Sequence, residues 1–158
     1  MILPAPDPSL PDLPVTFRPR RARLVAYTVA GLTVAVLVVV AGLLPATGGV
    51  RYALADRVGL VLLAVPVVGV LHLLARPRVV AREQGLLVVN MLRRRWLEWP
   101  EIVEVNLREG DPWVSLDLAN GDTLAVMALQ AADGRRGRDQ AVLLRRFVQQ
   151  RSQTERDD

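Results

Sequence analysis

The sequence predicts an α+β protein in which a two-helix transmembrane hairpin precedes a small antiparallel sheet that is capped by a C-terminal helix. Residues 24–44 and 58–75 are long apolar runs without Asp, Glu, Lys or Arg. Residues 79–129 hold short apolar segments separated by turn residues, and residues 138–151 have the spacing of an amphipathic helix. We therefore expect a tail (1–17), the hairpin (18–78), a folded domain (79–151) and a polar C-terminal tail (152–158).

The first 17 residues carry prolines at short intervals, namely Pro4, Pro6, Pro8, Pro11 and Pro14. Proline fixes φ and removes a backbone donor, so this spacing is incompatible with a helix or a sheet and favours extended, solvated chain. We expect residues 1–17 to be a disordered tail.

The two apolar runs have the length of membrane-spanning helices. About 20 residues at a 1.5 Å rise cross a ~30 Å hydrocarbon core, and neither run has the polar face of a soluble helix. Pro66 lacks a backbone donor, which predicts a kink near residues 62–66. Small residues four positions apart, at Ala26/Ala30 and Gly31/Ala35, would allow close helix packing.

His72 is the only histidine of the chain and lies within the second run. An ionisable residue inside a span is a functional candidate, but His72 has no Asp or Glu partner in either run. Its position about one turn from the end of the span favours an interfacial histidine that reaches the lipid headgroups.

Arginines gather outside the two runs and are fewer between them. Cytoplasmic flanks of membrane helices carry the excess of Arg and Lys, so both outer ends are expected in the cytoplasm. The sequence thus predicts a multi-pass plasma membrane protein whose N-terminus and C-terminal domain are cytoplasmic. The arginines that set this topology are Arg18, Arg20, Arg21, Arg23, Arg76 and Arg78.

The region after the hairpin alternates apolar and polar residues with a period of two, as half-buried strands do. We expect Val103, Val105 and Leu107 to face the same side of one strand. Asn120-Gly121 is a strong signal for a two-residue hairpin turn. Six strands of an antiparallel meander are expected, at 79–82, 86–92, 93–99, 102–108, 114–118 and 123–129.

The helix expected over residues 138–151 carries an apolar stripe that starts at Ala141 and repeats at i+3 and i+7. The stripe must be buried, and the open end of the sheet is the surface available for it. We predict that Phe147 on this helix, Trp99 at the end of the third strand and Ile102 at the start of the fourth belong to the core.

Several short motifs stand in the order and spacing of a known family: Arg18-Pro19-Arg20, Glu83-Gln84-Gly85-Leu86, Asn90 to Arg93, Trp99-Pro100-Glu101-Ile102 and Asn120-Gly121. They resemble a bacterial PH-like domain, and more narrowly the PH domain of the low-molecular-weight protein antigen 6 family. The resemblance covers roughly residues 17–150. It implies a PH-like β-barrel or sandwich in a membrane-bound protein without an assigned biochemical role. The predicted sheet has six strands where a full PH domain has seven, and no phosphoinositide-pocket motif is present.

The composition argues against an enzyme. The chain has no cysteine, and its one histidine lies in an apolar run, so the sequence offers neither a nucleophile–base pair nor a thiolate metal site. It also has no Gly-rich phosphate loop and no cluster with metal-ligand spacing. We therefore predict no catalytic residues, no metal and no cofactor.

The best binding candidate is the run Arg93, Arg94, Arg95 and Trp96, in which three guanidiniums adjoin an indole. The preferred function is a non-enzymatic, membrane-anchored PH-like module that binds a protein partner at the cytoplasmic face of the plasma membrane. One alternative is recognition of anionic lipid headgroups by Arg93–Arg95 and the arginines flanking the spans. Another is an accessory subunit of a larger membrane complex, contacted through the helices. Nucleic acid, supported only by the net charge of +4, is the least favoured partner.

Overall fold

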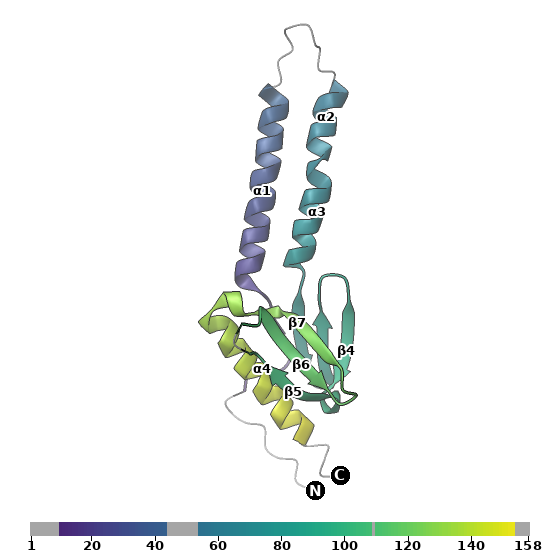
Figure 1. Ribbon diagram of the computed structural model, residues 1–158, viewed down its shortest axis with the longest axis vertical. Coiled ribbons are helices and arrows are strands. Elements are labelled where there is room, and N and C mark those ends of the chain that lie inside the picture. The colour runs from purple at the N-terminus through teal and green to yellow at the C-terminus, as the bar shows by residue number, and fades with distance from the viewer. Residues whose placement is uncertain (1–9, 44–53, 109, 154–158) are drawn as a thin grey trace. The chain divides into compact units, whose positions relative to one another are not determined.

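The computed structural model describes residues 10–43, 54–108 and 110–153, which form an α+β protein (Figure 1). The chain divides into two compact units. The hairpin comprises Ala22–Ala75, and the domain combines Met1–Arg21 with Arg76–Asp158. The hairpin is thus inserted within the sequence of the domain.

The helical elements of the hairpin are α1 (Arg20–Leu43), α2 (Leu54–Leu62) and α3 (Ala64–Ala75). The first helix and the stretch Leu54–Ala75 are long and apolar enough to cross a membrane, by length and composition. The second stretch is interrupted at Leu63, inside the range where Pro66 predicts a kink, because Pro66 has no N–H for the carbonyl group four residues earlier.

The described residues of the domain form two antiparallel sheets and a C-terminal helix (Figure 1). Sheet A has the order β1-β2-β3-β4, with β1 (Val15–Phe17), β2 (Arg78–Arg82), β3 (Gly85–Val89) and β4 (Arg94–Glu98). Sheet B has the order β5-β6-β7, with β5 (Ile102–Asn106), β6 (Trp113–Leu118) and β7 (Thr123–Gln130). The short helices η1 (Trp99–Glu101) and η2 (Ala131–Asp133) precede β5 and the long helix α4 (Arg135–Gln153), respectively.

The described residues contain one strand more than the sequence predicts, and it precedes the hairpin. β1 pairs antiparallel with β2, so that Phe17 lies opposite Val79. The prediction of a disordered tail is therefore wrong for residues 15–17, while residues 1–9 lie outside the described part of the chain. Pro14 stands before the strand and not within it, and the three strand residues are β-formers. Phe17, at 2% exposure, fixes the strand to the core.

A bulge in β5 overturns one predicted face. Val103 is 54% exposed although Val105, on the same predicted face, is 5% exposed. The register with β6 shifts between Ile102 and Glu104, which adds one residue to β5 and breaks the alternation. Ile102 takes the buried position instead.

The helix α4 is longer than predicted at both ends. It begins at Arg135 and includes Ser152, which the sequence assigns to a polar tail. The Ser152 hydroxyl donates to the Trp99 carbonyl oxygen at 2.8 Å, and Arg151 pairs with Glu83 at 2.9 Å, so the last turn is held to the domain. Residues 154–158 lie outside the described part of the chain.

Both sheets and α4 share one core. The Trp99 ring stacks on Phe147 with ring centroids 6.4 Å apart, and its indole N–H donates to the carbonyl oxygens of Arg82 and Glu83. This contact closes the corner between β4 and β5 under α4. The largest fully buried side chains of the core are Phe17, Leu86, Leu97, Ile102, Leu116, Leu129 and Leu144.

Asn90 joins the β3–β4 turn to sheet B. Its side-chain amide donates to the Ala125 carbonyl oxygen at 2.8 Å and accepts from the Met127 N–H at 3.2 Å. The amide thus satisfies two backbone groups of β7 in the manner of a neighbouring strand. At the other end of β3, a Cβ on Gly85 would collide with the Leu97 carbonyl oxygen, so the close β3–β4 pairing there requires glycine.

Candidate interaction surfaces

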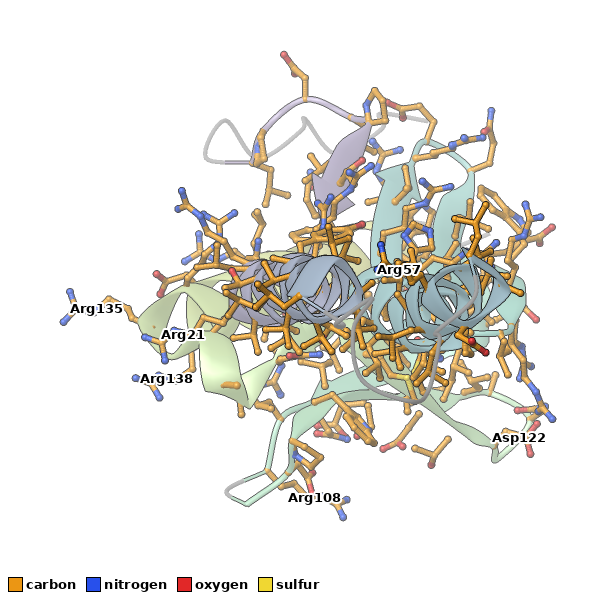
Figure 2. The ribbon with its side chains drawn as sticks, turned by 90° about the horizontal axis from the view of Figure 1, so that it is seen from above. Arg21, Arg57, Arg108, Asp122, Arg135 and Arg138 are labelled. Carbon is orange, nitrogen blue, oxygen red and sulfur yellow. The ribbon has the colours of Figure 1, made fainter. Side chains whose placement is uncertain are left out.

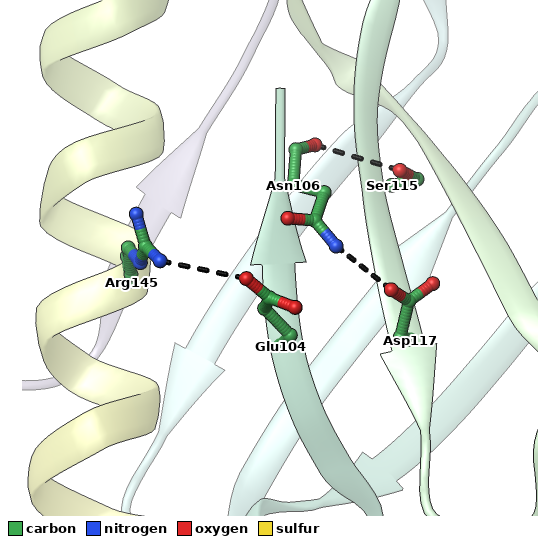
Figure 3. A network of polar contacts seen from close by, with 5 residues as sticks. All are labelled: Glu104, Asn106, Ser115, Asp117 and Arg145. Carbon is green, nitrogen blue, oxygen red and sulfur yellow. Dashed lines mark hydrogen bonds and ion pairs between the residues drawn. The ribbon is translucent and has the colours of Figure 1, made fainter. Parts of the chain in front are cut away.

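The described residues hold no group of three or more His, Asp or Glu that could bind a metal ion. Ser115, one of the few hydroxyls of the domain, donates to the Asn106 carbonyl oxygen at 3.5 Å (Figure 3). The same strand pair carries a bond from the Asn106 amide to Asp117 at 2.7 Å, and Glu104 pairs with Arg145 of α4 at 3.5 Å. These contacts tie β5 to β6 and to α4 at the surface of the domain, and they stabilise the fold.

The arginine run of β4 does not form one surface. Successive strand residues point to opposite faces. Arg94 and Trp96 point outward, whereas Arg95 shares the inward face with the buried Leu97 and lies opposite the buried Val88. Arg93 is exposed in the turn before the strand. The structure therefore separates Arg95 from Arg94 and Trp96.

The outward residues of sheet A form an apolar row that we call the Trp96 row. The register across all four strands aligns Thr16, Val80, Leu87 and Trp96. Trp96 is 40% exposed, and Val80 and Leu87 are half-buried. The row is bordered on one side by Arg78 and Arg94, which both lie opposite Val89, and on the other by Arg82 and Glu98, which both lie opposite Gly85.

The β3–β4 turn displays an apolar side chain at its tip. Leu92 is 80% exposed, and Arg93 and Arg94, both exposed, follow it. A turn residue of this kind has no core contact to explain its apolar character, and an exposed aliphatic tip beside arginines is suited to a boundary between apolar and charged surroundings.

The start of α1 is capped by a carboxylate far away in sequence. Asp133 in η2 accepts hydrogen bonds from the backbone N–H groups of Arg20 and Arg21, both at 2.9 Å. The Arg21 guanidinium also donates to the Ala132 carbonyl oxygen at 2.8 Å. Asp133 is the one buried charged residue among the described residues, and it neutralises orphan donors at the positive end of the helix. The sequence gives no local sign of this cap.

A basic cluster begins directly after this cap. Arg135, Arg136 and Arg138 are exposed within the first four residues of α4, whose first turn contains no acidic residue. Figure 2 shows Arg135 and Arg138 projecting outward from the start of α4, with Arg21 also labelled. Positive charges near a helix N-terminus oppose the helix dipole. We call these three residues the α4 arginines. The helix predicted from the sequence begins at residue 138, so it leaves Arg135 and Arg136 outside.

Within the hairpin, His72 has a partner from the other helix. The Tyr27 hydroxyl lies 3.4 Å from His72 Nδ1, and the two rings are 6.3 Å apart. Of the small-residue pairs, Ala26 and Ala30 are buried, whereas Gly31 and Ala35 are exposed.

The remaining predicted residues fall into two groups. Trp99, Ile102 and Phe147 are buried in the core of the domain. The arginines flanking the spans lie within four residues of the ends of α1 and α3, and most are exposed: Arg18, Arg20, Arg21, Arg76 and Arg78, with Arg23 half-buried.

Comparison with known proteins gives a family and relatives. Residues 76–146 match the family described as Bacterial PH domain. The chain is 39% identical over 124 residues to "Uncharacterized protein Rv1417" of Mycobacterium tuberculosis (strain ATCC 25618 / H37Rv), an alignment that covers 77% of this chain and 80% of the relative. The same identity and coverage hold for "Uncharacterized protein Mb1452" of Mycobacterium bovis. No solved structure matches the chain.

Proposed function

The chain belongs to the family of these mycobacterial proteins and matches the bacterial PH domain over residues 76–146, and from this premise we propose that it is a membrane-anchored, non-enzymatic PH-like module. It binds a protein partner at the cytoplasmic face of the plasma membrane, with its N-terminus and its domain on that side. Closer kinship with the low-molecular-weight protein antigen 6 family is part of the same proposal.

The observation that supports the anchoring is the length and apolar composition of α1 and of Leu54–Ala75. The pairing of β1 with β2 around the hairpin supports a shared side for both of its ends. Phe17, three residues before α1, lies opposite Val79, four residues after α3. The chain enters the hairpin from β1 and leaves it into β2, and these two strands are neighbours in one sheet. Both ends of the hairpin must therefore lie on the same side of any membrane that it spans. This parity agrees with the arginines beside both outer ends, which favour the cytoplasm.

The Trp96 row is the surface that we assign to the partner. An exposed Trp among half-buried aliphatic residues has the composition of an interface anchor, since Trp and Arg are enriched among residues that dominate binding energy. Arg82 and Glu98 border the row on the side away from the hairpin, so the complementary surface is apolar with charges of both signs at that rim.

The non-enzymatic part of the proposal rests on the residue types available. The domain contains neither His nor Cys, and the Ser115 hydroxyl donates to the backbone carbonyl oxygen of Asn106. General acid–base and nucleophilic chemistry need such pairs within hydrogen-bonding distance.

The alternative in which Arg93–Arg95 together bind lipid is less favoured as a unit, because Arg95 faces away from Arg94. An accessory role in a larger membrane complex, contacted through the helices, is compatible with the exposed apolar side chains of the hairpin.

The test is affinity purification of the full chain from gently solubilised membranes. We expect a stoichiometric companion with the wild type and its loss with Trp96→Ala, because truncating an interface anchor costs about 2 kcal/mol or more, roughly 30-fold in affinity. The matched control is Val103→Ala, an exposed apolar residue of sheet B, which should retain the companion. A companion that survives Trp96→Ala, or none in the wild type, contradicts the proposal.

A further inference from the structure

The domain has an end from which the hairpin leaves and to which it returns, and we call this the entry end. It is defined by Phe17 and Val79, which pair in sheet A. The β3–β4 turn lies at the same end, because Val89 pairs with both Arg78 and Arg94. The start of α4 lies there as well, because η2, directly before it, is bonded to Arg20 and Arg21.

The exposed arginines of the domain are concentrated at the entry end. The α4 arginines follow η2 within five residues, and Arg93 and Arg94 flank the tip of the β3–β4 turn. Arg95, on the inward face, and Trp96, one row further along the strand, are not part of this cluster. The two basic groups come from segments about 40 residues apart and meet at one end only through the fold.

The opposite end of the domain is acidic. Glu98 ends β4, Glu101 lies in η1, and Asp122 lies in the β6–β7 turn, which is joined to η1 by the bond from the Ala119 N–H to the Glu101 carbonyl oxygen at 2.9 Å. Glu83 in the β2–β3 turn is neutralised by Arg151. Arg82, beside Glu98 at this end, offsets one of these carboxylates, and the domain is a dipole whose positive pole is the entry end.

We propose that the entry end docks on the anionic surface of the bilayer that holds the hairpin, with Leu92 at the boundary between headgroups and acyl chains. This inference rests on the proposed membrane anchoring. Arg78 is only three residues from the end of α3, at most about 10 Å of extended chain. Arg94 lies about 10 Å from Arg78 across the sheet, because Val89 stands between them on the middle strand. Arginines so placed meet lipid phosphates at high effective concentration, and the otherwise unexplained exposed leucine gains an apolar contact.

The chain has no cysteine, which allows single-cysteine labelling without a background. The experiment uses full chains reconstituted in nanodiscs of phosphatidylcholine with or without phosphatidylglycerol, each labelled with an environment-sensitive fluorophore. Quenching is measured with nitroxide lipids whose spin label lies near the headgroups or within the acyl chains. The labelled positions are Leu92→Cys at the turn, Ala119→Cys at the opposite end, and Val36→Cys in the middle of α1.

We expect the Leu92→Cys label to be quenched by the headgroup-level nitroxide when phosphatidylglycerol is present, and less as salt is raised, because the attraction is screened. The Ala119→Cys label should stay unquenched. The Val36→Cys label should be quenched by the acyl-chain nitroxide in both lipids, since it reports only the span. If Val36→Cys reports lipid and Leu92→Cys behaves like Ala119→Cys, the docking inference fails while the anchoring stands. If Val36→Cys reports water, the anchoring itself fails.

A charge-matched pair of variants tests the α4 arginines in the Leu92→Cys background. Replacing Arg135, Arg136 and Arg138 by Ser should lower the docking equilibrium roughly 100-fold, about fivefold for each arginine. Replacing Arg82, Arg145 and Arg146 by Ser removes the same charge outside the entry end, keeps the Arg151–Glu83 pair and should leave quenching unchanged. Equal quenching in the two variants would overturn the assignment of the α4 arginines to the bilayer.

Discussion

The hairpin and the domain bury opposite kinds of side chain. In the domain the buried residues include Phe17, Trp99 and Phe147 together with many Leu and Val, whereas in the described part of the hairpin they are alanines. Large apolar residues of the hairpin, such as Val36 at 58%, are mostly exposed. Water would disfavour so large an apolar surface, which soluble monomers avoid. The difference fits two solvents, hydrocarbon around the hairpin and water around the domain.

Removing β1 should cause the largest loss of stability in the domain. A soluble chain of residues 76–153 lacks Phe17, and it should be less stable by at least about 3–5 kcal/mol than a chain in which a Gly-Ser linker joins residues 10–21 to it. Urea unfolding followed by circular dichroism measures the difference. Equal unfolding midpoints would mean that β1 is dispensable.

A charge in the core should disrupt the domain and leave the hairpin inserted. Phe147→Asp places an unpaired carboxylate against the Trp99 ring in the core, and we expect the free energy of unfolding of the domain to fall by at least about 3–5 kcal/mol. Protease sensitivity of the domain in membranes containing the full chain reports this loss. A domain that stays resistant in this variant would show that α4 does not seal the core.

The sharpest comparison places the same substitution at two valines of similar exposure, 58% at Val36 and 54% at Val103. Val36→Asp should disfavour insertion of its span by about 3 kcal/mol, because an Asp near the centre of a membrane helix is costly. Val103→Asp, on a strand facing water, should change domain stability by no more than about 0.5 kcal/mol. Insertion is scored with engineered glycosylation sites and stability by urea unfolding. Comparable small effects at both sites would remove the distinction between the two solvents.

The Asp133 cap should contribute a smaller amount. Asp133→Ala leaves the N–H groups of Arg20 and Arg21 without their acceptor, and we expect a loss of about 1–2 kcal/mol. Faster amide hydrogen exchange at these two residues is the direct measurement. Asp139→Ala, an exposed carboxylate of α4, serves as the control and should leave that exchange unchanged.

The smallest effect is expected at the polar contact inside the hairpin. Tyr27→Phe removes the hydroxyl beside His72, and hydrogen bonds between membrane helices are worth about 0.6 kcal/mol on average. Unfolding of the hairpin in mixed detergent micelles measures it. A loss above about 2 kcal/mol would assign the pair a larger role than that of an ordinary interhelical contact.

Local patterns predicted most of the fold. The apolar runs, the period-two strands and the stripe of α4 all depend on residues close in sequence, and each element is present in the structure. β1 could not be read in this way, because only its pairing with residues more than 60 positions away distinguishes it from the proline-rich segment before it. The bulge that exposes Val103 depends on the register with β6, which residues 102–108 do not reveal.

The candidate surfaces were less predictable than the fold. Successive residues of a strand point to opposite faces, so the sequence already implies that Arg94 and Arg95 do not share a face. The prediction of Arg93–Arg95 as one basic cluster did not apply this alternation. Asp133 and the first residues of α1 are more than 110 positions apart, and nothing local announces their contact. The predicted helix begins only at residue 138, so the sequence did not place Arg135 and Arg136 at a helix start, and only the fold brings the α4 arginines to the entry end.

The pairing of β1 with β2 also orders events during synthesis. β1 leaves the ribosome first, but its partner follows about 60 residues later, roughly 3–12 seconds at ~5–20 residues per second. If the hairpin spans a bilayer as proposed, a chain that inserts only its first helix has β1 and β2 on opposite sides of the membrane. The core position that Phe17 fills is then empty. The domain can therefore finish folding only after both helices have inserted. A chain that fails to insert both helices keeps apolar core residues exposed, and cellular proteases degrade such unfolded chains.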